Sequence, residues 1–260
     1  MNFKMKAVVA ALALTASMSA SAAMTNNISG ASSLILTLID NTNDISMTVD
    51  LGFSNTSFDR NSSFSWDISG GDYVDAWATF WGTATVATTQ WAVVSGDKLA
   101  PNSVFTTVST LATGVTAIPT YTQLTTALGN FDSYINANNL IGNHQAVANG
   151  ASVSTGGLAF AEMSTAYNTN GTYQGIIGDT TGALDSNLSV YTFTGAAASG
   201  LTKTVRAQYA TGEGFNPYFN LSSTGALTYT AAAVPEADTW AMLLAGLGLM
   251  GFIARRRTAV

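Results

Sequence analysis

The stretch that decides the fold runs from Leu34 to Leu51 and reads LILTLIDNTNDISMTVDL. Its first six residues are almost all apolar, and the seven from Ile45 to Leu51 alternate strictly between apolar and polar side chains. Alternation with a period of two is typical of a strand, and a short apolar run fits a buried one. The intervening residues, Asp40 to Asp44, are turn formers. The pattern therefore predicts a β-hairpin.

Further strand-like stretches follow this hairpin along the chain. They alternate apolar and polar residues or are rich in β-branched and aromatic residues, and they lie between turn signals. These predicted strands are Thr85 to Val94, Leu188 to Phe193, Thr204 to Tyr209, and a final hairpin of Tyr218 to Leu221 with Ala226 to Thr230.

Two segments are predicted to be helical. In the first, apolar residues recur every three or four positions and form one stripe, made of Tyr121, Leu124, Leu128, Phe131 and Ile135. Thr120 and Gln123 form a capping box at its start. The second segment, from Tyr73 to Trp81, fits a short helix, although the alternation of Trp77, Thr79 and Trp81 also fits a strand.

Residues 23–233 contain no Pro-rich or charged linker, so this span of 211 residues is predicted to be one domain. Aromatic residues make up 10% of the chain, which favours a folded body over a disordered one. The expected fold is mainly β: a single β-sandwich-like domain with one or two inserted helices. A mixed α+β sheet is the alternative.

The charge of this body excludes one class of partner. Residues 23–233 contain 13 acidic and 4 basic side chains, a net charge of −9. Such a surface repels phosphate backbones, so nucleic-acid binding is not expected. The chain has no cysteine, which excludes disulfides, thiolate metal sites and cysteine nucleophiles.

The N-terminal 22 residues have the three parts of a secretory signal peptide. Lys4 and Lys6 are followed by an apolar run from Ala7 to Leu14, and then by small residues that end in Ala20-Ser21-Ala22. Cleavage is expected after Ala22, which predicts an exported protein.

The C-terminal part of the chain predicts a transmembrane helix. Sixteen residues, Thr239 to Ala254, carry no charge and are followed by Arg255, Arg256 and Arg257. An arginine cluster favours the cytoplasmic side of a membrane. The body is therefore expected outside the inner membrane, which agrees with the signal peptide.

These residues resemble a specific sorting signal. Pro235-Glu236, a short apolar helix rich in Gly, Leu and Met, and a final arginine cluster are the layout of the PEP-CTERM signal, although Ala237 replaces the usual second proline. The resemblance implies that residues 234–257 are processed by exosortase in a bacterium that makes exopolysaccharide. It also implies transient anchoring in the inner membrane, and then a place at the cell surface or in the matrix. The body is similar to those of other PEP-CTERM proteins with no assigned activity, in the first hairpin (Leu34 to Leu51) and in the stretches Trp91 to Asp97, Asn143 to Gly150 and Leu221 to Thr230.

The residues that can carry chemistry are few. His144 is the only histidine, and it is expected to be exposed or a local hydrogen-bond partner. No G-x-S-x-G turn is present to supply an activated serine. A glycosidase needs two carboxylates at a set separation. The candidates are Asp72, Asp75, Glu162, Asp179, Asp185 and Glu213.

Two acidic stretches and four tryptophans leave alternatives open. Asp40 to Asp44 and Gly70 to Asp75 offer oxygen ligands for calcium, but turn formation explains the same residues and is favoured. Trp66, Trp77, Trp81 and Trp91 can stack on sugar rings or pack in the core, and core packing is favoured.

The prediction for function is an exported cell-envelope or exopolysaccharide-matrix protein, sorted by exosortase through Pro235, Glu236, Arg255, Arg256 and Arg257. It is expected to be structural, non-enzymatic and without a cofactor. A carbohydrate-binding module that uses the tryptophans is the first alternative, and a secreted glycan-active enzyme is the second.

Overall fold

The computed structural model describes residues 23–27, 30–99, 102–111, 119–161, 178–195, 200–208 and 217–231. The predicted signal peptide (1–22), sorting signal (234–257) and transmembrane helix (239–254) lie outside these ranges. Within them, no helix is both long enough and apolar enough to cross a membrane.

The predicted first hairpin forms β1 (Ser33–Asp40) and β2 (Ile45–Ser54), with Asp40 paired to Ile45 across the turn. β1 also pairs with β4 (Gln90–Asp97), so the hairpin lies inside the sheet and not at its edge. An apolar run such as that of β1 suits this position, because both faces of the strand are covered.

An 11-stranded antiparallel sheet dominates the structure, with the strand order β3-β13-β12-β10-β5-β4-β1-β2-β7. Two further strands complete this sheet: β11 pairs with β10, and β9 pairs with β4. β6 and β8 form a separate two-stranded sheet. The remaining strands are β3 (Phe64–Asp67), β5 (Ser103–Val108), β6 (Thr110–Leu111), β7 (Ala151–Ser154), β8 (Gly178–Asp179), β9 (Gly182–Ala183), β10 (Asn187–Thr194), β11 (Val205–Gln208), β12 (Tyr218–Leu221) and β13 (Ala226–Thr230).

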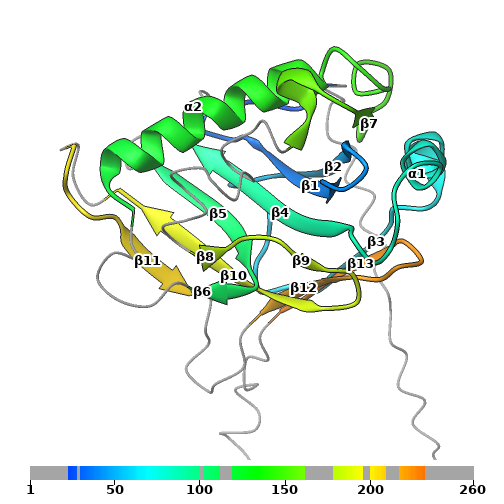
Figure 1. Cartoon of the computed structure of the whole chain (residues 1–260). Coiled ribbons are helices and arrows are strands. Elements are labelled where there is room, and N and C mark those ends of the chain that lie inside the picture. The colour runs from blue at the N-terminus through cyan, green and yellow to red at the C-terminus, as the bar shows by residue number, and fades with distance from the viewer. Residues whose placement is uncertain are drawn as a thin grey trace, which may run out of the picture.

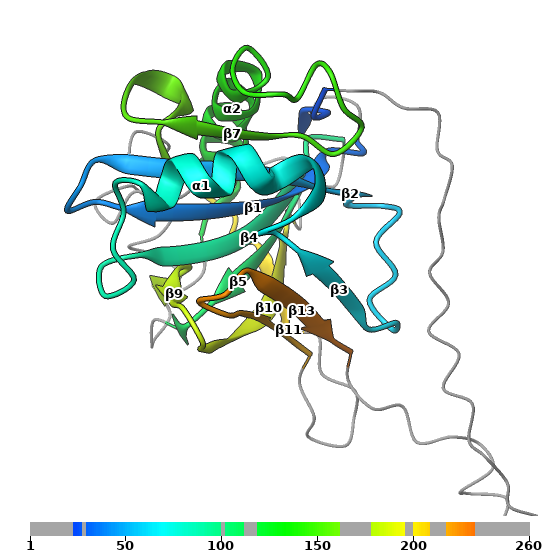
Figure 2. The same cartoon turned by 90° about the vertical axis from the view of Figure 1, so that its right-hand side faces the viewer.

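The sheet curls, as Figure 2 shows between β2 and β1 above and β13 and β3 below. One apolar core fills the concave side and joins residues from both halves, such as Leu36 and Val49 with Phe219 and Leu227. Accumulated strand twist produces such a curl without breaking the hydrogen-bond ladder. The mainly β prediction is confirmed, but the two layers expected of a sandwich are parts of one continuous sheet.

Helix α2 (Tyr121–Asn138) covers the convex face of the sheet (Figure 1). Four residues of its predicted stripe pack in a second core with residues of β1, β4, β5 and β10, while the fifth, Tyr121, is half-buried and lies outside it. The predicted capping box is present: the Thr120 hydroxyl accepts from the Gln123 N–H, and the Gln123 side chain accepts from the Thr120 N–H. The Tyr121 N–H donates to Thr202, so a neighbouring loop satisfies another free donor of the first turn.

Helix α1 (Val74–Trp81) resolves the ambiguity around Trp77 in favour of a helix. A 3₁₀ turn, Gly71–Tyr73, precedes it. The side chain of Phe80 is fully buried in the concave core, and α1 packs near β2 and β7. Figure 2 shows α1 lying across these strands.

The predicted strand from Thr85 to Val94 is wrong in its first half. Thr88 and Thr89 donate backbone hydrogen bonds to the Thr85 carbonyl, and the Thr85 N–H donates to the Asp40 carboxylate. These contacts form a turn, and β4 begins only at Gln90.

Candidate functional site

The predicted carboxylates lie on separate elements. Asp72 and Asp75 are exposed at the start of α1, and Asp179 is exposed in β8. Asp185 follows β9, and its Oδ1 accepts from the Ser223 N–H at 3.1 Å. Glu162 and Glu213 lie outside the described residues. Among the residues that the structure describes, no three His, Asp or Glu side chains gather as a metal site would require.

The Asp40 carboxylate holds its turn together. Oδ1 accepts from the backbone of Thr42 and Asn43, and Oδ2 accepts from the Asn43 side chain at 2.7 Å and the Thr85 N–H at 2.9 Å. Burial raises the pKa of Asp40, but these hydrogen bonds outweigh it and leave the pKa below its ordinary value. Both oxygens therefore serve the turn, as the turn interpretation expects.

His144 is buried and is a local hydrogen-bond partner, so of the two predicted alternatives the exposed one is wrong. Its Nε2 lies 3.0 Å from the Ser152 hydroxyl, which donates to Asn138 Oδ1 at 2.7 Å. Because Ser152 uses its proton on Asn138, Nε2 carries the proton that His144 donates. Burial lowers the pKa of His144 to about 4, so the ring is neutral at pH 7.

This Ser-His pair is structural. The His144 and Ser152 side chains are 0% and 1% exposed, so a substrate cannot reach either of them from solvent. Asn138 also donates to the carbonyls of Tyr134 and Ala159. The network therefore connects the end of α2 to β7 and to the 3₁₀ turn Gly157–Ala159, which follows β7.

Asp50 is a buried ionisable residue that the sequence pattern did not reveal. Alternation placed it on the polar face of β2, where solvent is the usual neighbour. At the neighbouring Thr48 that face is covered by α2, whose Tyr134 hydroxyl bonds Thr48 and, at 3.1 Å, Thr37. Burial raises the pKa of Asp50 to about 6. Hydrogen bonds from the Gly52 N–H and the Ser33 hydroxyl lower the pKa, but their effect is smaller than that of burial.

The four tryptophans divide into two groups. Trp91 is fully buried, and its indole N–H donates to the Ala183 carbonyl at 3.0 Å, so the core interpretation holds for it. Trp66, Trp77 and Trp81 are half-buried and pack against the concave core. The rings of Trp77 and Trp81 meet edge to face at 72°, so this pair does not form one flat platform.

The five predicted sorting residues, Pro235, Glu236, Arg255, Arg256 and Arg257, lie outside the described residues. Comparison with protein families provides independent evidence on the segment that contains them. Residues 233–257 match the model of the PEP-CTERM protein-sorting motif. The chain matches no curated protein and no solved structure. The match confirms the predicted sorting signal, which marks a secreted, exosortase-targeted protein.

Proposed function

Because the chain carries a PEP-CTERM sorting motif, we propose that it is a structural, non-enzymatic protein of the cell surface or exopolysaccharide matrix. The signal peptide starts its export, and the helix from Thr239 to Ala254 anchors it in the inner membrane with Arg255, Arg256 and Arg257 on the cytoplasmic side. Exosortase then processes the tail and frees the body. The motif match is the observation that carries this proposal.

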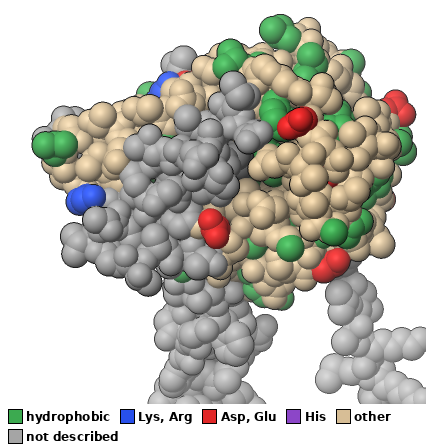
Figure 3. Space-filling view, viewed as in Figure 1, with side chains coloured by type: hydrophobic (Ala, Val, Ile, Leu, Met, Phe, Trp, Pro, Cys, Tyr) green, Lys and Arg blue, Asp and Glu red, His purple; other side chains and the backbone are tan. Residues whose placement is uncertain are grey.

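The surface of the body supports a matrix role. On the described part of the face in Figure 3, most atoms belong to the backbone or to side chains that are neither charged nor hydrophobic, carboxylates are spread singly, and hydrophobic side chains form small groups. A net charge of −9 over residues 23–233 keeps such a protein hydrated and dispersed.

The surroundings of the His144 ring and the Asp40 carboxylate support a non-enzymatic role. The only histidine is inaccessible, and Asp40 is occupied by turn hydrogen bonds. Neither residue is available as a general acid or base for a substrate from solvent.

Processing is tested by replacing Pro235 and Glu236 with alanine together. The variant should accumulate in the inner membrane with its tail attached, as the unaltered chain should in cells without exosortase. The matched control replaces Lys203 and Arg206, which lie far from the motif in sequence, and should be sorted normally. Normal release of the Pro235 and Glu236 variant would refute recognition of the motif.

Carbohydrate binding through Trp66, Trp77 and Trp81 is the second candidate, because part of each of these rings reaches the surface. Stacking of an aromatic ring on a sugar would quench or shift tryptophan emission. Added polysaccharide should therefore change the fluorescence of the unaltered protein and not that of a Trp66→Ala, Trp77→Ala, Trp81→Ala variant. Emission that no polysaccharide alters would reject this candidate.

A further inference from the structure

A polar cavity of about 440 Å³ lies where β9 meets β4 and where β10 begins. This volume is within the usual range for small-molecule sites. Its lining residues are Gln90, Ser109, Asp179, Thr181, Gly182, Ala183, Ser186, Asn187 and Leu188. Among them, the side chains of Gln90, Ser109, Asp179 and Asn187 are exposed and accessible to a ligand.

The fold holds the floor of this cavity in place. β9 pairs with β4: Gln90 lies opposite Ala183, and Trp91 lies opposite Gly182. The indole N–H of the buried Trp91 also donates to the Ala183 carbonyl. A Cβ at Gly182 would lie too close to Leu188 Cδ2, so a larger residue here would make the Leu188 side chain shift. The cavity therefore exists before any ligand arrives, which lowers the entropy cost of binding.

Beside β9, hydroxyl groups from the β5 segment fix the strand connection. The Thr107 hydroxyl donates to the Thr180 carbonyl at 3.0 Å, and the Ser109 hydroxyl donates to the Thr181 carbonyl at 2.6 Å. These bonds keep Asp179 and Thr181 at fixed places on the wall.

Two amide side chains of the wall are already oriented. The Thr181 hydroxyl donates to Gln90 Oε1 at 2.9 Å, which leaves the Gln90 NH₂ group to face outward as a donor. Asn220 donates to Asn187 Oδ1 at 2.9 Å and orients the Asn187 amide in the same way. The Asp179 carboxylate accepts no hydrogen bond from the described part of the chain.

The lining selects the charge of the ligand. Among the residues that the structure describes, it contains one carboxylate and no lysine, arginine or histidine. An anionic ligand would meet Asp179 without a compensating cation. A neutral ligand with many hydroxyl groups satisfies both the carboxylate and the two amides.

We propose that this cavity binds a neutral sugar unit, with Asp179 accepting from its hydroxyls and Gln90 and Asn187 donating to them. The exposed Ala183 supplies apolar contact for the C–H face of the ring. The ligand class follows from the lining. Only the idea that the ligand belongs to a matrix polysaccharide rests on the proposed function.

The test is isothermal titration of the protein, purified from the producing cells, with three neutral hexasaccharides: a β-1,4-glucan, a β-1,3-glucan and an α-mannan. A hexauronate serves as the anionic probe. At least one neutral sugar should bind and the hexauronate should not. Asp179→Asn and Asn187→Ala should each weaken binding by about tenfold, the usual loss for one hydrogen bond to a charged or oriented group.

Two controls separate this cavity from other surfaces. Asp75→Asn makes the same charge change on α1, and Trp77→Ala removes an aromatic ring of the other candidate surface; both should bind as the unaltered protein does. Failure of every neutral sugar to bind, or binding that needs added calcium or survives both cavity substitutions, would overturn the proposal. Processing by exosortase is measured separately, so the two proposals fail independently.

Discussion

At the scale of single residues, Asp50 and His144 are buried groups whose pKa values move in opposite senses. Burial raises the pKa of Asp50 to about 6 and lowers that of His144 to about 4. Below pH 6 the native state takes up a proton at Asp50 more readily than the unfolded chain does. At His144 the unfolded chain is the one that takes up the proton more readily.

These shifts predict opposite pH dependences of stability. The unfolded pKa of Asp50 is about 3.8, so its contribution falls as the pH rises from about 4 to 6. The unfolded pKa of His144 is about 6.5, so its contribution falls as the pH drops from 6.5 to about 4. The two nearly cancel, and the unaltered protein should unfold at a similar urea concentration across this window.

Single substitutions should reveal each slope. Asp50→Asn keeps only the His144 shift, so the variant should lose stability when the pH falls from 6.5 to 4. His144→Gln keeps only the Asp50 shift, so the variant should gain stability over the same fall in pH. Each difference should reach at most about 3 kcal/mol, the equivalent of two pKa units. The measurement is urea unfolding followed by circular dichroism at several pH values. Identical slopes in the two variants would contradict the assigned burial.

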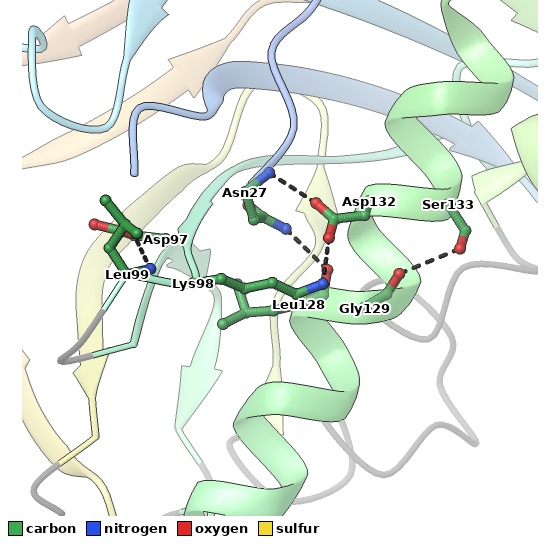
Figure 4. Close-up of polar contacts among 8 residues, drawn as sticks. All are labelled: Asn27, Asp97, Lys98, Leu99, Leu128, Gly129, Asp132 and Ser133. Atoms are coloured by element: carbon green, nitrogen blue, oxygen red, sulfur yellow. Dashed lines mark hydrogen bonds and ion pairs between the residues drawn. The ribbon is translucent and has the colours of Figure 1, made fainter. Parts of the chain in front are cut away.

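At the scale of elements, α2 is held to the sheet by a segment that precedes β1. The Asn27 N–H donates to Asp132 Oδ1 at 2.7 Å, and its side chain donates to the Leu128 carbonyl at 2.9 Å (Figure 4). Lys98 forms an ion pair with the other Asp132 oxygen. Asp132 is therefore one of the side chains that attach residues 23–27 to α2.

Asp132→Ala should destabilise the protein by about 2 kcal/mol, because it leaves the buried Asn27 N–H without an acceptor and Lys98 without its carboxylate. The matched control is Ser133→Ala, one position along α2, whose hydroxyl bonds only the Gly129 carbonyl of the same helix (Figure 4). It should change stability by less than about 0.5 kcal/mol. Thermal unfolding checks both, and equal losses would contradict this attachment.

How far the elements follow from sequence depends on how local their signals are. The β1–β2 hairpin, the capped helix α2 and the β12–β13 hairpin have periodicity and turn or cap signals of their own, and all were predicted. β3 and β7 are four residues long and gave no usable pattern. β5 is buried at both Val104 and Phe105, so it lacks the alternation that marks a strand with one solvent face.

The candidate sites depend on contacts between distant segments, which a single sequence does not show. The buried Asp50 carboxylate accepts from Ser33 of the neighbouring strand β1, and the buried His144 ring meets Ser152, which donates to Asn138 of α2. The polar cavity joins Gln90 to residues nearly a hundred positions later. The sorting motif, by contrast, is contiguous, and it was recognised from its residues alone.

At the scale of the whole molecule, the curled sheet needs a filling for its concave side. Phe58, from the loop between β2 and β3, lies within 4.9–6.0 Å, centroid to centroid, of five other aromatic rings. The Tyr229 hydroxyl donates to the Arg60 carbonyl and fixes the same loop. The loop therefore fills the space between β2 and the β3–β13 end of the sheet.

Phe58→Ala should cost about 3–5 kcal/mol, because it leaves a cavity that neighbouring rings fill only in part. Phe53→Ala removes the same ring from a half-buried neighbouring position and should cost clearly less. Urea unfolding measures both. Equal costs would mean that the loop does not hold the curl.

The central claim is that this body is carried across the inner membrane, held by its tail and then freed by exosortase. The most direct test is the intact mass of the protein from wild-type cells and from cells that lack exosortase. The account predicts a wild-type form that begins at Ala23 and has lost Trp240 to Val260, and a mutant form that still ends at Val260 in the inner membrane. A wild-type protein that keeps both ends, or that stays in the cytosol, would contradict it.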